Sequence, residues 1–242
     1  MRYLVAAAIW GVVFGSVFGP HPARDDTAQP SLLVRACQAM DQPENAAIAC
    51  RRAIASGRWT GAKAAWAWTN LGLANAAQRR FLAAIKAYDR ALEAVPDYAP
   101  ALANRGNAHA ALGDMLSALA DHDRALALEP DNPSAWMNRG ADREDLGQYR
   151  AALEDYAQAI KLDPRHRGAH IGLATARCKL GQAKASAEAR LRAVEKGLID
   201  AKALQVTLQD EGFYKGAIDG IFGKGSRAAL RAWTRAGCVA PA

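Results

Sequence analysis

Four cysteines are the side chains with the widest range of chemistry in this 242-residue chain: Cys37, Cys50, Cys178 and Cys238. A thiol can act as a nucleophile, ligate a metal ion or pair in a disulfide. Cys37 and Cys50 have no evident activating histidine, and no further cysteine or histidine lies near them in sequence to complete a zinc site. We therefore expect structural thiols, whose pairing depends on the elements that hold them.

The remaining candidates give no sign of catalysis. His166 and His170 lie four residues apart and would share one helix face, but arginines beside them disfavour a bound cation, so we interpret them as solvated. The chain has no serine in a nucleophile elbow and no glycine-rich phosphate loop. We interpret four dispersed carboxylates as ordinary helix-surface charge: Asp121, Asp123, Glu144 and Asp145. The sequence thus predicts a protein that is not an enzyme, with no cofactor and no metal.

The elements that must position these residues repeat every 34 residues. Three sets of residues carry the period: Gly72, Gly106 and Gly140; Asn70, Asn104 and Asn138; Pro96, Pro130 and Pro164. A fixed period of this length predicts stacked units along one axis. Within a unit, a glycine such as Gly113 or Gly147 closes the first helix, and a proline ends the second. The sequence therefore predicts an all-α solenoid of helix hairpins.

Seven residues of the first regular unit match, in register, the pattern of the tetratricopeptide repeat family. They are Trp68, Leu71, Gly72, Ala84, Tyr88, Ala91 and Pro96. The chain resembles this family over residues 66–164, which implies a right-handed solenoid of helix hairpins. We expect three regular repeats and a degenerate fourth over residues 65–198, with an imperfect first repeat over residues 31–64. The resemblance also implies that the concave face binds a protein or peptide partner.

Successive first helices would line that concave face. The groove-facing candidates are Trp66, Thr69, Asn70, Leu73, Asn104, Asn107, Met137, Asn138 and Ala141. The three asparagines at 34-residue spacing would form a ladder that hydrogen-bonds an extended peptide backbone. Two alternatives stay open, namely that the asparagines are solvated or that they brace a neighbouring helix.

The repeat register also places two slots opposite each other in every hairpin. Cys37 and Cys50 hold these slots in the imperfect first repeat. In an exported protein, a disulfide closing this short loop would stabilise the fold by roughly 3 kcal/mol, and two buried free cysteines are the alternative. His109 and His122 hold the same slots in the second regular repeat, where we expect a hydrogen-bonded or stacked pair rather than a metal site.

The N-terminal residues predict export. Arg2 precedes an apolar run over residues 3–18, which is short for a membrane span and suits the apolar part of a secretory signal within residues 1–19. An uncleaved anchor in the inner membrane is the alternative, because no Ala-x-Ala cleavage site follows. Residues 20–30 resemble a proline-rich linker in composition. We expect a periplasmic protein, for which nucleic acid is not a partner and the membrane is one only if residues 1–19 remain.

A different pattern begins at residue 199. The run Ile-Asp-Gly-Ile-Phe-Gly at residues 218–223, followed by Ser-Arg-Ala-Ala-Leu at residues 226–230, resembles the small three-helix peptidoglycan-binding domain of bacterial cell-wall hydrolases. The resemblance implies such a domain over residues 199–242. Its expected core is Leu204, Leu208, Phe213, Ile218, Ile221, Phe222, Leu230 and Trp233. The exposed candidates for contact with anionic, sugar-bearing strands are Tyr214, Lys215, Lys224, Arg227 and Arg231, with ordinary surface residues as the alternative.

Cys178 and Cys238 lie in the fourth repeat and at the end of the C-terminal domain. We predict that they pair and pin this domain onto the solenoid, with two unpaired thiols as the alternative. Together the patterns favour a non-catalytic envelope adaptor that binds a protein or peptide through its repeats and peptidoglycan through its C-terminal domain. The formal net charge of +7 fits an anionic wall polymer. The alternative function is a targeting or regulatory subunit of a separate peptidoglycan hydrolase.

Overall fold

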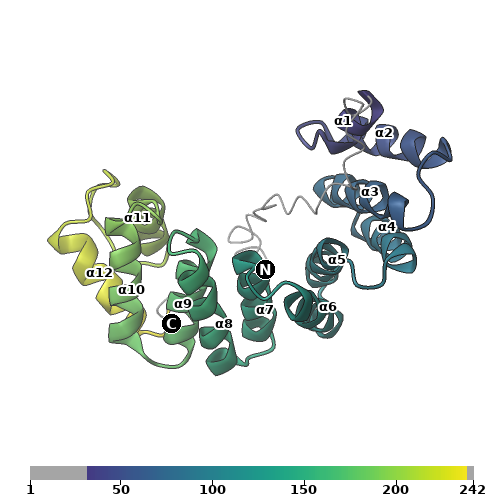
Figure 1. Ribbon diagram of the computed structural model, residues 1–242. Coiled ribbons are helices and arrows are strands. Elements are labelled where there is room, and N and C mark those ends of the chain that lie inside the picture. The colour runs from purple at the N-terminus through teal and green to yellow at the C-terminus, as the bar shows by residue number, and fades with distance from the viewer. Residues whose placement is uncertain (1–31, 239–242) are drawn as a thin grey trace. The chain divides into compact units, whose positions relative to one another are not determined.

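The computed structural model describes residues 32–238, and every regular element in that range is helical (Figure 1). The predicted signal or anchor and the linker lie outside the described residues. The elements are α1 Leu32–Gln38, α2 Pro43–Ala55, the 3₁₀ helix η2 Gly61–Ala64, α3 Ala65–Ala77, α4 Phe81–Ala94, α5 Ala99–Ala111, α6 Met115–Leu128, α7 Pro133–Asp145, α8 Tyr149–Leu162, α9 Arg167–Lys179, α10 Ala183–Glu195, α11 Ala201–Asp210 and α12 Lys224–Arg235. The described range contains no strand, which confirms the all-α prediction. None of its helices combines the length and the apolar character needed to cross a lipid bilayer.

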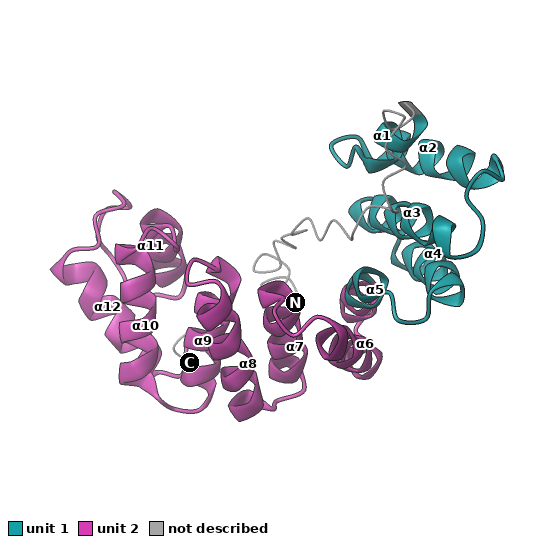
Figure 2. Cartoon of the chain, viewed as in Figure 1, with its two compact units in different colours: residues 1–104 teal, residues 105–242 magenta. Residues whose placement is uncertain are grey.

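The chain divides into two compact units, residues 1–104 and residues 105–242, with the boundary inside α5 (Figure 2). Within the first unit, α1 packs on α2, α2 on α3, and α3 on α4. Within the second unit, α6 packs on α7, and the same order continues through α8, α9 and α10. Each helix therefore contacts mainly its neighbours in sequence, which is the packing of a solenoid.

The turns inside the hairpins depend on one residue with positive φ. Gly113, Gly147 and Gly181 have φ values of 84°, 73° and 72°. Arg79 occupies the equivalent position in the first regular repeat with φ of 57°, a conformation that is costly for a residue with a side chain. The next helix begins almost at once, as in α6, where the Asp114 side chain accepts a hydrogen bond from the first-turn backbone.

The two helices of a hairpin approach closely at a glycine. A Cβ atom added to Gly72 would lie 2.2 Å from Cε1 of Tyr88, and one added to Gly140 would lie 2.9 Å from Cε1 of Tyr156. Tyr88 is fully buried. Because no side chain fits between the glycine backbone and the ring, the contact sets the distance between the helix axes. This explains why glycine and an aromatic residue share the 34-residue period.

Both predicted disulfides are present. Cys37 on α1 pairs with Cys50 on α2, so the short first hairpin is cross-linked. Cys178 on α9 pairs with Cys238, which follows α12. The second bond therefore joins the C-terminal segment (residues 199–238) to the last repeat.

The C-terminal segment differs from the predicted three-helix domain. It contains α11 and α12, and residues 211–223 between them form no helix. Its apolar core includes Leu208 and Trp233, and Ala187 and Leu191 of α10 pack into the same cluster. A segment this short has too little apolar surface for a separate core, so it shares one with the last repeat.

The loop between α11 and α12 is organised by one buried amide. Gln205 is fully buried, and its Nε2 donates to Asp219 Oδ1 and to the backbone oxygen of Ile221, while its Oε1 accepts from Gly220 N. Because the backbone of Ile221 faces inward, its side chain is 70% exposed. The prediction that Ile221 belongs to the core is therefore wrong.

Candidate functional site

The middle repeats (residues 105–162) bury charges inside the solenoid. Asp121 is 7% exposed and accepts hydrogen bonds from Arg105 at 2.8 and 2.7 Å. Asp155 is 1% exposed and accepts two from Arg139 and one from Arg143. The interpretation of Asp121 as surface charge is therefore wrong. The missed signal is a spacing that recurs with the repeat, because an arginine precedes its aspartate by 16 residues in both pairs.

The imidazole of His122 joins two neighbouring repeats. Its Nδ1 lies 2.5 Å from Asp142 Oδ2 on α7, and its Nε2 lies 3.2 Å from Asn107 Oδ1 on α5. These partners of His122 were not predicted. His109, the residue that was expected to pair with His122, has its Nδ1 3.4 Å from Asp114 Oδ2. Burial raises the pKa of Asp142, against the opposing effect of His122. Among residues 32–238, no group of three potential ligands could hold a metal ion.

Two of the predicted groove-facing residues are buried. Trp66 is 9% exposed, because the ring of Trp59 packs edge-on against it at 5.5 Å between centroids. Thr69 is 4% exposed and donates its hydroxyl to Ala65 O in its own helix. The prediction that Trp66 and Thr69 face a peptide is therefore wrong. The other candidates are partly exposed: Asn70, Leu73, Asn104, Asn107, Met137, Asn138 and Ala141.

Two of the three asparagines in the predicted ladder donate hydrogen bonds within the protein. Asn104 Nδ2 donates to Pro100 O of its own helix at 2.7 Å. Asn138 Nδ2 donates to Asn107 Oδ1 at 2.8 Å, on the first helix of the preceding repeat. Asn138 therefore braces a neighbouring helix, which is one of the alternatives that the sequence left open.

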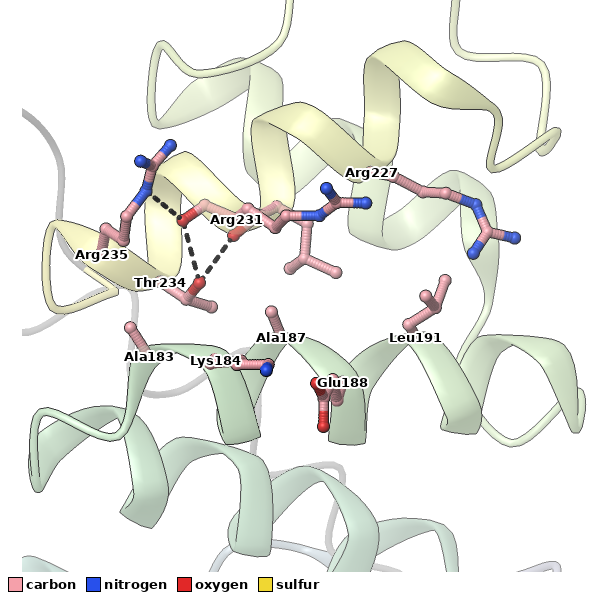
Figure 3. Close-up of a pocket in the computed structure, with 10 residues that line it drawn as sticks. Ala183, Lys184, Ala187, Glu188, Leu191, Arg227, Arg231, Thr234 and Arg235 are labelled. Atoms are coloured by element: carbon pink, nitrogen blue, oxygen red, sulfur yellow. Dashed lines mark hydrogen bonds between the residues drawn. The ribbon is translucent and has the colours of Figure 1, made fainter.

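A groove of about 540 Å³ lies between α10 and α12 (Figure 3). Its ten lining residues are Ala183, Lys184, Ala187, Glu188, Leu191, Arg227, Leu230, Arg231, Thr234 and Arg235. Four of these side chains are basic and one is acidic, whereas Ala183 and Leu191 provide partly exposed apolar surface. Such a lining suits an anionic ligand that also has small apolar groups.

Besides the exposed ion pair of Arg227 with Glu195, two contacts beyond the apolar core hold α12 against the last repeat. One is the Cys178–Cys238 disulfide. The other is Arg190 of α10, whose guanidinium carbon lies 4.8 Å from the ring centroid of Trp233. Burial lowers the pKa of Arg190 to about 10, so the guanidinium stays charged at neutral pH. Because one wall of the groove comes from α10 and the other from α12, the groove requires this docking.

The structure brings together two of the five predicted wall-contacting residues. Arg227 and Arg231 line the groove, whereas Tyr214, Lys215 and Lys224 do not. The Tyr214 ring is partly buried against the segment's core, and its hydroxyl donates to a backbone oxygen in its own loop. The five predicted residues therefore do not form one surface, because the two arginines line the groove and the tyrosine ring does not.

Two basic residues of the groove, Lys184 and Arg235, were not predicted. Arg235 follows Arg231 by four residues, so the spacing on α12 would have revealed it. Lys184 lies on α10, in the last repeat. Its place in the groove depends on how the C-terminal segment docks, which no spacing in the sequence indicates.

Comparison with known proteins agrees with this architecture. Residues 32–99 and residues 105–191 each match a family model described as tetratricopeptide repeat. A solved structure of MamA residues 41 to the end from Desulfovibrio magneticus RS-1 is 19% identical, with a TM-score of 0.60 over 66% of this chain and 89% of that one. A second MamA structure is 17% identical, with a TM-score of 0.61 over 70% of this chain and 96% of that one. At these identities the likeness shows the fold alone. A search of curated proteins gives no match.

Proposed function

Because this chain carries tetratricopeptide repeats over residues 32–99 and 105–191, we propose that it is a non-catalytic adaptor of the bacterial cell envelope. Its repeats bind a protein or peptide partner, and its C-terminal segment binds peptidoglycan. The protein works in the periplasm, to which residues 1–19 direct it and where they either are removed or remain as an anchor in the inner membrane.

Two features support these roles for the repeats and the compartment. The first helices of the repeats keep partly exposed residues of mixed character, among them Asn70, Leu73 and Ala141, which suit contact with another chain. Both disulfides favour an oxidising compartment, since such bonds are rare where thiols are kept reduced.

The observation that carries wall binding is the basic groove between α10 and α12. Arg227 and Arg231, which the resemblance to wall-binding domains singled out, lie there beside Lys184 and Arg235. Peptidoglycan is anionic through its carboxylates, so a groove lined by four basic side chains has the complementary charge.

Co-sedimentation with purified cell-wall sacculi tests this role. We expect the oxidised chain to sediment at low salt and to be released as the salt concentration rises, because exposed charge pairs are screened. Arg231→Gln should reduce the sedimented fraction. Arg192→Gln is the matched control, since Arg192 is an exposed arginine of α10 outside the groove lining. A wild-type chain that stays in the supernatant at low salt would remove wall binding from the proposal.

The partner-binding role is tested separately by cross-linking in intact cells. A photo-reactive residue placed at Asn70 should capture a protein, because the side chain there is partly exposed on α3. The same residue at Lys86, on the exposed side of α4, is the control. Equal labelling at both positions would contradict a specific docking face.

A further inference from the structure

One face of α12 carries a row of three arginines. Arg227, Arg231 and Arg235 follow one another at intervals of four residues, so they share a helix face. A rise of 1.5 Å per residue places successive arginines about 6 Å apart along the axis. Arg235 lies at one end of the groove, Arg227 at the other and Arg231 between them (Figure 3).

The arginines differ in how far the protein already uses them. Arg227 Nη2 lies 3.2 Å from Glu195 Oε1, and its Nε donates to Phe222 O. The Arg231 guanidinium has no hydrogen bond or ion pair to any residue within 32–238. Arg231 can therefore offer its fork of N–H groups to a carboxylate, which a guanidinium binds with two parallel hydrogen bonds.

The single acidic lining residue does not neutralise this row. Glu188 lies on α10 and points away from α12 (Figure 3). Lys184, on the same helix, adds a further positive charge to the lining. The groove lining therefore keeps a net positive charge, carried by Lys184, Arg231 and Arg235, because Arg227 at one end is paired with Glu195.

The rest of the lining suits small side chains and offers no surface for stacking a sugar. Ala183 and Leu191, which are partly exposed, supply small aliphatic groups, and none of the ten lining residues, all of which are described, is aromatic. The two nearby rings are otherwise engaged: Trp233 is 8% exposed, and Tyr214 packs against the core of its own segment.

From this lining we infer that the groove binds the short peptides of the cell wall through their free carboxylates, and not the sugar backbone of the wall. Those peptides combine carboxylates with small side chains such as alanine, which matches a lining of arginines and small aliphatic side chains. The inference rests on the proposed binding of peptidoglycan and adds the chemical class of the group that is recognised.

The test measures binding of three soluble probes to the full oxidised chain by isothermal titration calorimetry. The probes are a synthetic wall peptide with free carboxylates, the same peptide with amidated carboxylates, and glycan strands from which the peptides have been removed. We expect the free peptide to bind, the amidated peptide to bind at least about 10-fold more weakly, and the glycan not to bind, because charge-assisted hydrogen bonds carry the affinity.

Variants assign the site. Arg231→Gln should weaken binding of the free peptide by about 5- to 10-fold, and Arg231→Lys should restore only part of it, because an ammonium cannot make the paired bonds. Arg192→Gln should leave binding unchanged. Circular dichroism of each variant checks folding, which we expect to be intact because Arg231 is exposed.

Each contrary result has a distinct meaning. Glycan or amidated peptide that binds as tightly as the free peptide would overturn the inference while sacculus binding stands. A glutamate-rich peptide of unrelated sequence that binds as tightly would overturn it in favour of an acidic protein partner. If the wild-type chain does not sediment with sacculi at all, the proposed wall binding itself fails.

Discussion

The N-terminal repeats (residues 32–94) and the middle repeats share one hairpin geometry but have chemically different interiors. In the N-terminal repeats, the Cys37–Cys50 disulfide lies in a cluster of alanines with Trp66 and Leu71. In the middle repeats, buried aspartates meet arginines and a histidine. The regular hairpins thus share the close contact of a glycine with a ring, while the rest of their interior is either apolar or charged.

The two interiors should also differ in what they contribute to stability. A cross-link stabilises by restricting the unfolded chain, whereas a buried ion pair gains little over apolar packing because both charges lose their water. Removing only one partner of such a pair is costly, since the other charge stays buried. The comparison therefore predicts different responses to matched substitutions in the two regions.

The largest expected effect is loss of the first cross-link. Cys37→Ala with Cys50→Ala should destabilise the N-terminal repeats by about 3 kcal/mol, the loop-closure entropy of a 13-residue separation. Hydrogen exchange of α1 and α2 measures it, because repeat arrays open locally. Cys178→Ala with Cys238→Ala is the control and should instead increase exchange in α12. Unchanged protection of α1 and α2 would mean that apolar packing alone holds the first hairpin.

A smaller effect is expected from breaking one buried ion pair. Asp155→Asn should destabilise the middle repeats by about 2 kcal/mol. Arg139 and Arg143 would lose the carboxylate that they share while their side chains stay largely buried, at 14% and 21% exposure. Asp123 is the other partner of Arg139, and its side chain is 51% exposed. Asp123→Asn should therefore cost less than about 0.5 kcal/mol. Urea denaturation compares the two variants, and equal costs would contradict a charged interior.

Two tyrosines in equivalent positions have different surroundings in the two regions. The Tyr88 hydroxyl is buried without a hydrogen-bond partner in the described residues, whereas the Tyr156 hydroxyl donates to Glu144 Oε2 at 3.0 Å. Tyr156→Phe should therefore cost about 1 kcal/mol, and Tyr88→Phe should be neutral or stabilising. Thermal unfolding of both variants provides the measurement. A larger loss from Tyr88→Phe would reverse this assignment.

The smallest effect is a dependence on pH confined to the middle repeats. Burial raises the pKa of Glu144 in the folded protein, so folding favours its protonated form. Its contribution to stability is fully present below the unfolded pKa and is lost as the pH rises through the higher folded pKa. Glu144→Gln should reduce this slope by about a few tenths of a kcal/mol per pH unit. Hydrogen exchange from acid to neutral pH measures it, with residues 32–94, where no described carboxylate is buried, as the reference.

The fold was accessible from sequence because its determinants are local and periodic. Gly72 and Tyr88 recur with the repeat, and Gly113 predicts a turn without knowledge of distant contacts. The pairing of Cys37 with Cys50 followed from the same register. Such features depend on residues within one hairpin, so counting along the chain is enough to find them.

The parts that sequence did not reveal depend on contacts outside the 34-residue repeat pattern. Trp66 lies on a first helix in the expected register, but Trp59 covers it. Arg231 was identified as exposed, yet its place beside Lys184 depends on docking of α12 against α10. Docking of this kind follows from shared burial of apolar surface, and the helical period alone carries no signal for it.

The pair of His122 and Asp142 has a consequence for assembly. The positions equivalent to His122 in the flanking regular repeats are tyrosines, and those equivalent to Asp142 at residues 108 and 176 are alanines. If a repeat packed against a neighbour other than its own, His122 or Asp142 would be buried without its partner, at a cost of several kcal/mol. The pair therefore favours the native stacking of these two repeats over other stackings as the solenoid folds.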